Sequence, residues 1–347
     1  MKKLNVVIVS PALADANNGN WQTARRWQRL LVKHKAHSVR IVRHWPDGPL
    51  AAQDDVMLAL HARRSAASLN AWAQARGPQG LAVVLTGTDL YQDLNQDLHN
   101  DRNHEDTVVR QSLALAPRLV VLQDQAPHML PADCRGKAQV ILPSVPTRQS
   151  LPKTTRHLRA VMVGHLRAEK DPLTLMAAAQ ALADAPDIFI DHIGAALDPA
   201  LGQAAQATAT QCPGYRWLGA LPHEITLRRI QRAHVLVHPS RLEGGAHVVM
   251  EAVRCGTPVL ASRIDGNVGM LGADYQGYFD VGDALGLAAL LRQCRADLIK
   301  PLPDNGSLLQ RLQRQCAQRA PLFSADREQA ALLALVDSLW TPLNASI

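Results

Sequence analysis

Short apolar segments alternate with longer amphipathic ones along most of this chain. Because alternating β and α segments are typical of βα units, this pattern favours parallel sheets covered by helices. In the first part of the chain, helices are expected at Trp21–Lys33 and Ala62–Ala75. The strands expected around them are Leu4–Ser10, Ser38–Val42, Val56–Leu60, Leu81–Leu85, Leu119–Leu122 and Gln139–Leu142.

A proline-rich stretch from Pro143 to Pro152 interrupts this pattern, as is typical of a linker. The second set of strands is expected at Leu158–Val163, Ile188–Ile193, Val235–His238 and Pro258–Ala261. Its helices are expected at Pro172–Ala183, Gly245–Arg254 and Ala284–Arg295. We therefore predict an α/β protein with two doubly wound, Rossmann-like domains, residues 1–150 and 151–324.

Residues 325–347 are expected to add a C-terminal helix that packs back toward the N-terminal domain. Its apolar positions Ala330, Leu333, Val336 and Leu339 recur with a period near 3.6, which predicts an amphipathic helix.

Composition narrows the possible partners. The 347 residues carry a formal net charge of +7, which suits anionic partners. No block of like charges and no nucleic-acid-reading motif is present, so we expect no nucleic-acid partner. The five cysteines lack zinc-site spacing, and no apolar run is long enough to span a bilayer. We expect a cytoplasmic protein with reduced thiols; membrane binding is disfavoured, although Trp21–Lys33 is basic and amphipathic.

The largest cluster of candidate functional residues follows the strand predicted to end at His238. Gly244 and Gly245 allow close backbone approach in the turn, and the helix expected to open near Gly245 would point its first amides at an anion. Glu251, expected about two turns into this helix, could accept hydrogen bonds from two ribose hydroxyls. Glu243 in the turn could reach the hydroxyls of a transferred sugar.

This stretch resembles the E-x7-E motif of glycosyltransferase family 4, whose GT-B fold has two Rossmann-like domains facing a central cleft. Residues 255–262 and 264–267 resemble the segments that follow this motif in the family, and residues 163–170 resemble the segment that clamps the donor diphosphate. The resemblance covers about residues 160–295 and implies a site for a UDP-sugar. The implied donor-binding residues are His165, Arg167, Lys170, Glu243, Gly244, Gly245, Ala246, His247, Glu251, Gly266 and Asn267.

Lys170 stands where the family has its phosphate-binding lysine, and with Glu243 it is an implied catalytic residue. The family usually has arginine at the position of His165; either His165 or the nearby Arg167 could complete the clamp. Fixed cations and a helix N-terminus can stabilise a leaving diphosphate without a metal. Since no Asp-x-Asp stands in a suitable place, we predict a metal-independent transferase with no cofactor other than the UDP-sugar co-substrate.

A candidate acceptor site lies in the first βα connection. Asparagine and glycine make its turn, and a basic helix follows, which together favour a small anion. Of Trp21 and Trp27, one is expected in the core, and the other could stack on a sugar. Asp89 is a third candidate catalytic residue, as a base or hydrogen-bond acceptor, or else a capping residue. The candidate acceptor-binding residues are Asn17, Asn18, Gly19, Asn20, Thr23, Arg25, Arg26 and Thr88.

Residues 11–27 and 85–91 are similar to the selenosugar synthases of selenoneine biosynthesis. That resemblance implies transfer of glucose or N-acetylglucosamine from a UDP-sugar to selenophosphate, with formation of a C–Se bond and release of UDP and phosphate. Two alternatives stay open. One is a family 4 enzyme with a glycan, lipid or thiol acceptor, and the other is a non-catalytic sugar-nucleotide-binding protein. The sequence does not choose the sugar, the anomeric outcome or the oligomeric state.

Overall fold

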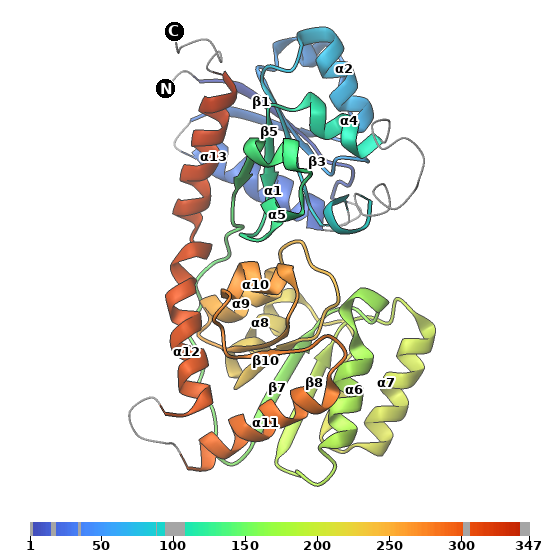
Figure 1. Ribbon diagram of the computed structural model, residues 1–347, viewed down its shortest axis with the longest axis vertical. Coiled ribbons are helices and arrows are strands. Elements are labelled where there is room, and N and C mark those ends of the chain that lie inside the picture. Colours follow the sequence, from blue (N-terminus) through green and yellow to red (C-terminus); the bar gives the residue numbers. More distant parts are fainter. Residues whose placement is uncertain are drawn as a thin grey trace. The chain divides into compact units, whose positions relative to one another are not determined.

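The computed structural model describes residues 3–14, 19–33, 36–87, 89–93, 108–300 and 306–340, with backbone only at 92 and 93 (Figure 1). The chain forms two units. The first comprises Met1–Ser144 and Ala325–Ile347, and the second comprises Val145–Ser324.

The first unit is built on a parallel sheet with strand order β2-β1-β3-β4-β5-β6. Its helical turns are η2 (Pro49–Gln53), the π-helical η3 (Asp89–Asp93) and η4 (Ala132–Lys137). Its strands and helices are β1 (Asn5–Val9), α1 (Gly19–Val32), β2 (Ser38–Val42), β3 (Val56–Leu60), α2 (Ala66–Arg76), β4 (Leu81–Val84), α4 (Val108–Leu115), β5 (Arg118–Val121), α5 (Ala126–Met129), β6 (Ala138–Val140) and α13 (Ala325–Trp340).

Both faces of this sheet are buried, which explains why its central strands are continuously apolar. Successive residues of β1 alternate between the faces: Val6 and Ile8 join a core with α1 and α13, whereas Val7 and Val9 join a core with α2 and α4. Strand β3 is buried at all five positions.

Helix α13 packs on α1, with a different apolar stripe from the predicted one. Leu332, Leu335, Val336 and Leu339 are buried, whereas Ala330 is exposed and Leu333 is only partly buried. Of the four apolar positions named from the sequence, Val336 and Leu339 are in the core, Leu333 packs against it, and Ala330 is exposed. A period near 3.6 fits more than one stripe, and the packing on α1 selects among them.

The second unit is built on a parallel sheet with strand order β12-β11-β10-β7-β8-β9. Its 3-10 turns are η5 (Ala168–Lys170) and η6 (Ala320–Phe323). Its strands and helices are β7 (Leu158–Val163), α6 (Pro172–Ala181), β8 (Ile188–Ile193), α7 (Pro199–Gln211), β9 (Tyr215–Trp217), α8 (His223–Arg232), β10 (Val235–His238), α9 (His247–Arg254), β11 (Val259–Ser262), α10 (Asp265–Leu271), β12 (Tyr278–Phe279), α11 (Ala284–Ile299) and α12 (Leu308–Arg319).

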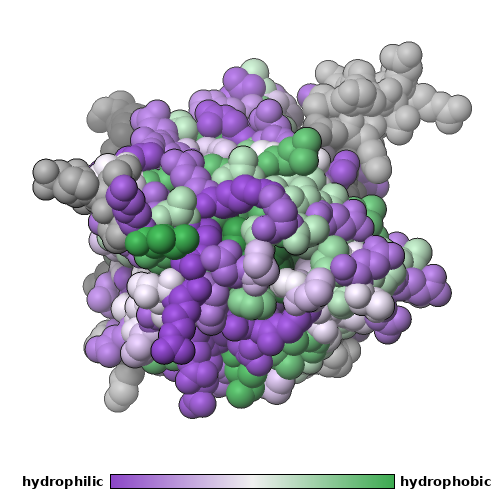
Figure 2. Space-filling model, turned by 90° about the horizontal axis from the view of Figure 1, so that it is seen from below, coloured by the Kyte–Doolittle hydropathy of each residue, from purple (hydrophilic) through white to green (hydrophobic). Residues whose placement is uncertain are grey.

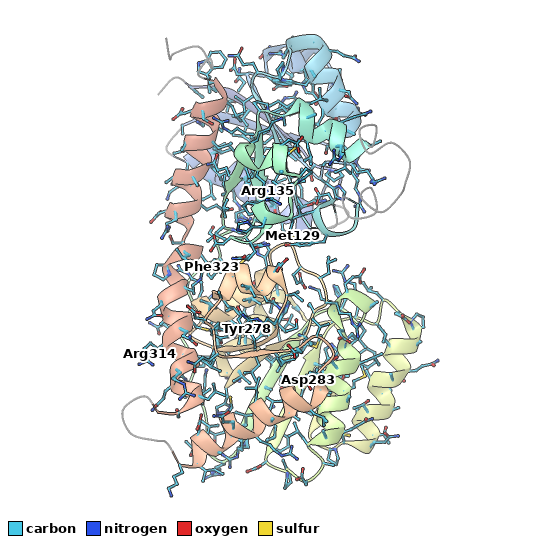
Figure 3. The ribbon with its side chains drawn as sticks, viewed as in Figure 1. Met129, Arg135, Tyr278, Asp283, Arg314 and Phe323 are labelled. Carbon is cyan, nitrogen blue, oxygen red and sulfur yellow. The ribbon has the colours of Figure 1, made fainter. Side chains whose placement is uncertain are left out.

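The chain passes between the units at two places. Entering the second unit, the Val145 amide donates to the Phe323 carbonyl at 3.2 Å, so its first residue lies beside η6. Phe323 itself is fully buried (Figure 3). In the first unit, the Ser144 amide donates to Glu328 of α13 at 2.8 Å.

The predicted bounds are confirmed for β2, β3, β7, β8 and β10. The strands and helices for which no bounds were predicted are β9, β12, α4, α5, α7, α8, α10 and α12. Strands β9 and β12 have three and two residues, too few for a periodic pattern. Helix α8 buries only Leu227 and Ile230 as large apolar residues, so its apolar pattern is weak.

Among the described residues, no helix combines the length and apolarity needed to cross a bilayer. On the face of the molecule shown in Figure 2, hydrophilic and hydrophobic residues are interspersed.

Candidate functional site

A cavity of about 320 Å³ opens in the second unit beyond the carboxyl ends of its central strands. This is the edge at which open α/β sheets bind ligands. The residues that line it come from the loops after β7, β8, β9 and β10 and from the starts of α8 and α9. They are Val163, Gly164, His165, Lys170, Ile193, Gly194, Ala220, Leu221, Thr226, Glu243, Gly245, Ala246, His247 and Val248.

Glycine permits two close backbone approaches at this site. A Cβ on Gly194 would lie 1.9 Å from the Gly164 carbonyl oxygen, so the loops after β7 and β8 can meet only without a side chain there. A Cβ on Gly266 would lie 2.2 Å from the Glu243 carbonyl oxygen. Gly266 therefore allows the turn that carries Glu243 to pack against α10.

Lys170 and Glu243 form an ion pair between the two loops that frame the cavity. Both side chains are largely buried, at 16% and 11% exposure. Arg241 holds these loops together: its amide donates to the Glu169 carbonyl at 2.9 Å, and its Nε lies 3.1 Å from Asp171 Oδ2. The pair is thus fixed before any ligand arrives.

Behind Glu243 lies a buried polar network centred on His238. The Asn267 amide group donates to the Ser262 carbonyl at 2.9 Å, which leaves Asn267 Oδ1 to accept from His238 Nδ1 at 3.0 Å. His238 Nε2 then faces Glu243 Oε1 at 3.4 Å. Asn267 is fully buried, so its side chain orients His238 and does not line the cavity.

The pKa of Glu243 lies well below its ordinary value. Burial by itself would raise this pKa. The charge of Lys170 and the hydrogen bond and charge of His238 lower the pKa by more than burial raises it. Glu243 is therefore ionised at neutral pH. A carboxylate accepts hydrogen bonds, and here it can accept them from sugar hydroxyls while it holds Lys170 in place.

Helix α9 begins at His247, two residues later than predicted. Its N-cap residue, Ala246, makes no side-chain capping hydrogen bond. The helix dipole favours an anion at the same place. Because Lys170 lines the same cavity, the cavity suits a diphosphate.

Glu251 is the fifth residue of α9, just over one turn from its start, so the prediction of two turns was wrong. It lies three and four residues beyond Val248 and His247, which line the cavity, but Glu251 itself is not among the lining residues. The Glu251 carboxylate, 16% exposed, bonds His223 Nε2 of α8 at 2.8 Å. This hydrogen bond raises the pKa of His223, against a lowering by burial.

His165 and Arg167 occupy different places. His165 lines the cavity, and its Nδ1 accepts from the Ala195 amide at 3.1 Å, which leaves Nε2 to carry the proton. Burial, followed by the charges of Arg167 and Lys170, lowers its pKa, so it is a neutral donor. Arg167 is half exposed, lies 3.8 Å from Glu169 and is not among the lining residues.

In the first unit, two candidate acceptor residues face inward. Arg26 Nε donates to both Glu328 oxygens, at 2.9 and 3.0 Å, and Thr23 is buried. Trp27 is the core tryptophan of α1, and its Nε1 donates to Glu328 at 2.8 Å. The charge of Arg26 is thus matched by Glu328.

The other candidate acceptor residues are scattered. Arg25 is exposed, Gly19 is the exposed first residue of α1, and Asn20 is buried. Three candidates lie outside the described residues: Asn17, Asn18 and Thr88.

Asp89 is fully buried at the start of η3. Its Oδ1 accepts from the Thr86 and Gly87 amides, both at 2.9 Å, and its Oδ2 accepts from the Ala62 amide at 3.0 Å. Burial raises its pKa, while His61 and these amides lower it. The carboxylate joins the turns after β3 and β4, which is the role of a turn-stabilising residue.

Several cavity residues were not predicted: Ile193, Gly194, Ala220, Leu221 and Thr226. Ile193 and Gly194 lie at the end of β8, whereas Ala220, Leu221 and Thr226 lie around β9 and α8, the elements with the weakest patterns. A glycine directly after β8 was the one available signal for Gly194. Among the described residues, no group of three or more His, Cys, Asp or Glu could hold a metal ion.

Residues 146–297 match the protein-family model described as "Glycosyl transferases group 1". Solved structures with the same fold include a sucrose-phosphate synthase from Thermosynechococcus elongatus, with 17% identity, TM-score 0.72 and coverage of 97% of this chain and 99% of that one. A glycosyltransferase from Rickettsia africae ESF-5 has 13% identity and TM-score 0.72, covering 99% and 100%. Anabaena HepE, solved in complex with UDP and glucose, has 16% identity and TM-score 0.67, covering 96% and 100%.

These comparisons confirm the predicted fold class: two Rossmann-like parallel sheets of the GT-B type. The match to the group 1 glycosyltransferase model lies within the second unit. The matched residues include the whole lining of the cavity described above.

Proposed function

We propose that this protein is a glycosyltransferase that takes its sugar from a UDP-sugar bound in the second unit. The observation that carries this proposal is the cavity in which the Lys170–Glu243 pair faces the uncapped start of α9. In support, this cavity lies within the stretch that matches the group 1 glycosyltransferases, and HepE, which has the same fold, has been solved with UDP and glucose.

The chemistry follows from the charges. When the bond between the anomeric carbon and the β-phosphate oxygen breaks, the electron pair leaves with UDP. In this proposal, Lys170, the His165 Nε2–H and the amides at the start of α9, which all lie in the cavity lining, stabilise that charge. Glu243 accepts hydrogen bonds from sugar hydroxyls, and Glu251 accepts from the ribose. No step in this scheme calls on a metal ion.

We further propose selenophosphate as the acceptor, on the resemblance of residues 11–27 and 85–91 to selenosugar synthases. Selenium attacks the anomeric carbon, the sugar–oxygen bond breaks, and UDP leaves. Water then takes the phosphoryl group from selenium, giving a selenosugar and phosphate. A selenium nucleophile needs little help from a general base, which is compatible with a buried, fully hydrogen-bonded Asp89.

One assay tests both the proposed glycosyltransferase activity and the proposed selenophosphate acceptor. The full chain is incubated with UDP-glucose or UDP-N-acetylglucosamine and selenophosphate, with and without EDTA, and products are identified by mass and anomeric coupling. We expect a selenosugar and UDP at rates that EDTA does not change. UDP release with a glycan, lipid or thiol but not with selenophosphate would overturn the acceptor proposal alone. UDP binding without turnover for any acceptor would overturn the proposed enzyme activity.

A further inference from the structure

A second cavity in the C-terminal unit is surrounded by arginines. It measures about 570 Å³ and shares no lining residue with the cavity that holds Lys170. We call it the arginine pocket. Its lining residues are Arg159, Arg216, Ile225, Arg228, Arg229 and Arg232.

Three elements build the arginine pocket. Ile225, Arg228, Arg229 and Arg232 follow one another at spacings of three, one and three on α8, so they form one stripe of that helix. Arg159 comes from β7 and Arg216 from β9. Thr226, on another face of α8, lines the Lys170 cavity, so this helix separates the two cavities.

A buried carboxylate organises three of the arginines. Asp191 on β8 has a side chain only 1% exposed. It accepts from Arg159 Nη1 at 3.1 Å, from Arg216 Nε at 2.9 Å and from Arg229 Nη1 at 3.2 Å. These guanidinium groups are therefore held at defined positions, although one carboxylate matches only one of their three charges.

The remaining two arginines add uncompensated charge. Arg228 and Arg232 are exposed, and among the described residues neither has an acidic partner. Five guanidinium groups thus face one carboxylate, an excess of four positive charges around a single cavity. Burial, followed by the charges of Arg159, Arg295 and Arg216, lowers the pKa of His157, while Asp187 raises it.

We propose that the arginine pocket binds a compact anion that carries two or more phosphate groups. Guanidinium groups match phosphate oxygens in a bidentate geometry, and the basic side chains of the lining are all arginine. A concave cavity of this volume is in the range of small-molecule sites, whereas a nucleic acid or membrane would be met by an extended surface. This proposal does not depend on the proposed donor site.

Calorimetric titration of the full chain with inorganic tripolyphosphate tests the proposal. The pocket variant Arg228→Gln/Arg232→Gln removes two exposed arginines that make no ion pair in the described structure. The control variant Lys300→Gln/Arg314→Gln removes the same charge from exposed positions elsewhere in the unit, Arg314 lying on α12 (Figure 3). We expect affinity to fall at least about tenfold in the pocket variant and less than about twofold in the control.

Titration of the Lys170→Ala variant separates the two cavities, because Lys170 lines only the first of them. The component that depends on Arg228 and Arg232 should persist in this variant. Equal losses in both variants would mean non-specific attraction and would overturn the proposal, as would unchanged affinity in the pocket variant. Tighter, arginine-dependent binding of a short RNA or of anionic phosphatidylserine vesicles would also overturn it, in favour of a macromolecular partner.

Discussion

The two units share one fold but use the charged residues of their βα connections and following helices differently. In the second unit, Lys170 and Glu243 are paired across a cavity and remain in its lining. In the first unit, Arg26 is directed to Glu328, and Asp89 is enclosed by three amides. A charged residue in a βα connection or the following helix therefore indicates a binding site only where its ion-pair partner leaves it in the lining of a cavity.

The largest expected effect is that of Lys170→Ala. It removes the fixed cation nearest the leaving diphosphate and leaves Glu243 without its main counter-charge. We expect turnover to fall about a hundredfold. Steady-state UDP release measures this effect, with Lys300→Ala as the matched control because Lys300 is an exposed lysine of the same unit. Wild-type turnover in the Lys170 variant would contradict the assigned role.

Asp89→Asn tests whether the buried carboxylate of the first unit stabilises the fold. An asparagine cannot accept at its nitrogen, so at least one of the Ala62, Thr86 and Gly87 amides would lose its buried acceptor. We expect the free energy of unfolding to fall by about 2 kcal/mol, measured by urea denaturation. Asp326→Asn, at a carboxylate 90% exposed, should change it by less than about 0.5 kcal/mol. If Asp89→Asn instead abolished turnover at unchanged stability, Asp89 would be a catalytic residue.

Glu251→Gln tests the nucleotide end of the cavity. The glutamine side chain keeps the shape of glutamate but loses the negative charge that strengthens hydrogen bonds to ribose hydroxyls. We expect UDP affinity to fall about tenfold by calorimetry, with a smaller change in turnover at saturating donor. Glu224→Gln is the control because Glu224 is 62% exposed and pairs with Arg148. An equal effect in both variants would remove Glu251 from the site.

The smallest expected effect concerns pH. Because the pKa of His223 is raised, its ion pair with Glu251 is present at low pH and is lost as pH rises through that pKa. Glu251 is then freed for the ribose, so UDP affinity should rise about two- to threefold between pH of about 6 and about 8. Glu224 and Arg148 also act on His223, with opposite signs. His223→Gln should flatten the profile, and a pH dependence that survives this substitution would have another origin.

The sequence alone determined those secondary-structure elements that depend on local geometry. Side-chain alternation and burial follow from the backbone of each strand, so β3, β7, β8 and β10 could be bounded before the structure was known. The turn with Gly244 and Gly245 and the helix after it were likewise readable from residue type, to within two residues.

Only the tertiary structure decided which charges face a ligand. Arg26 meets Glu328 across 302 positions of sequence, Asp89 meets the Ala62 amide across 27, and the arginine pocket joins β7, β9 and α8 around Asp191. Propensity and periodicity describe a residue's own segment, whereas an ion pair depends on which segments the topology brings together. The fold class was therefore accessible from sequence, and the partner of each charge was not.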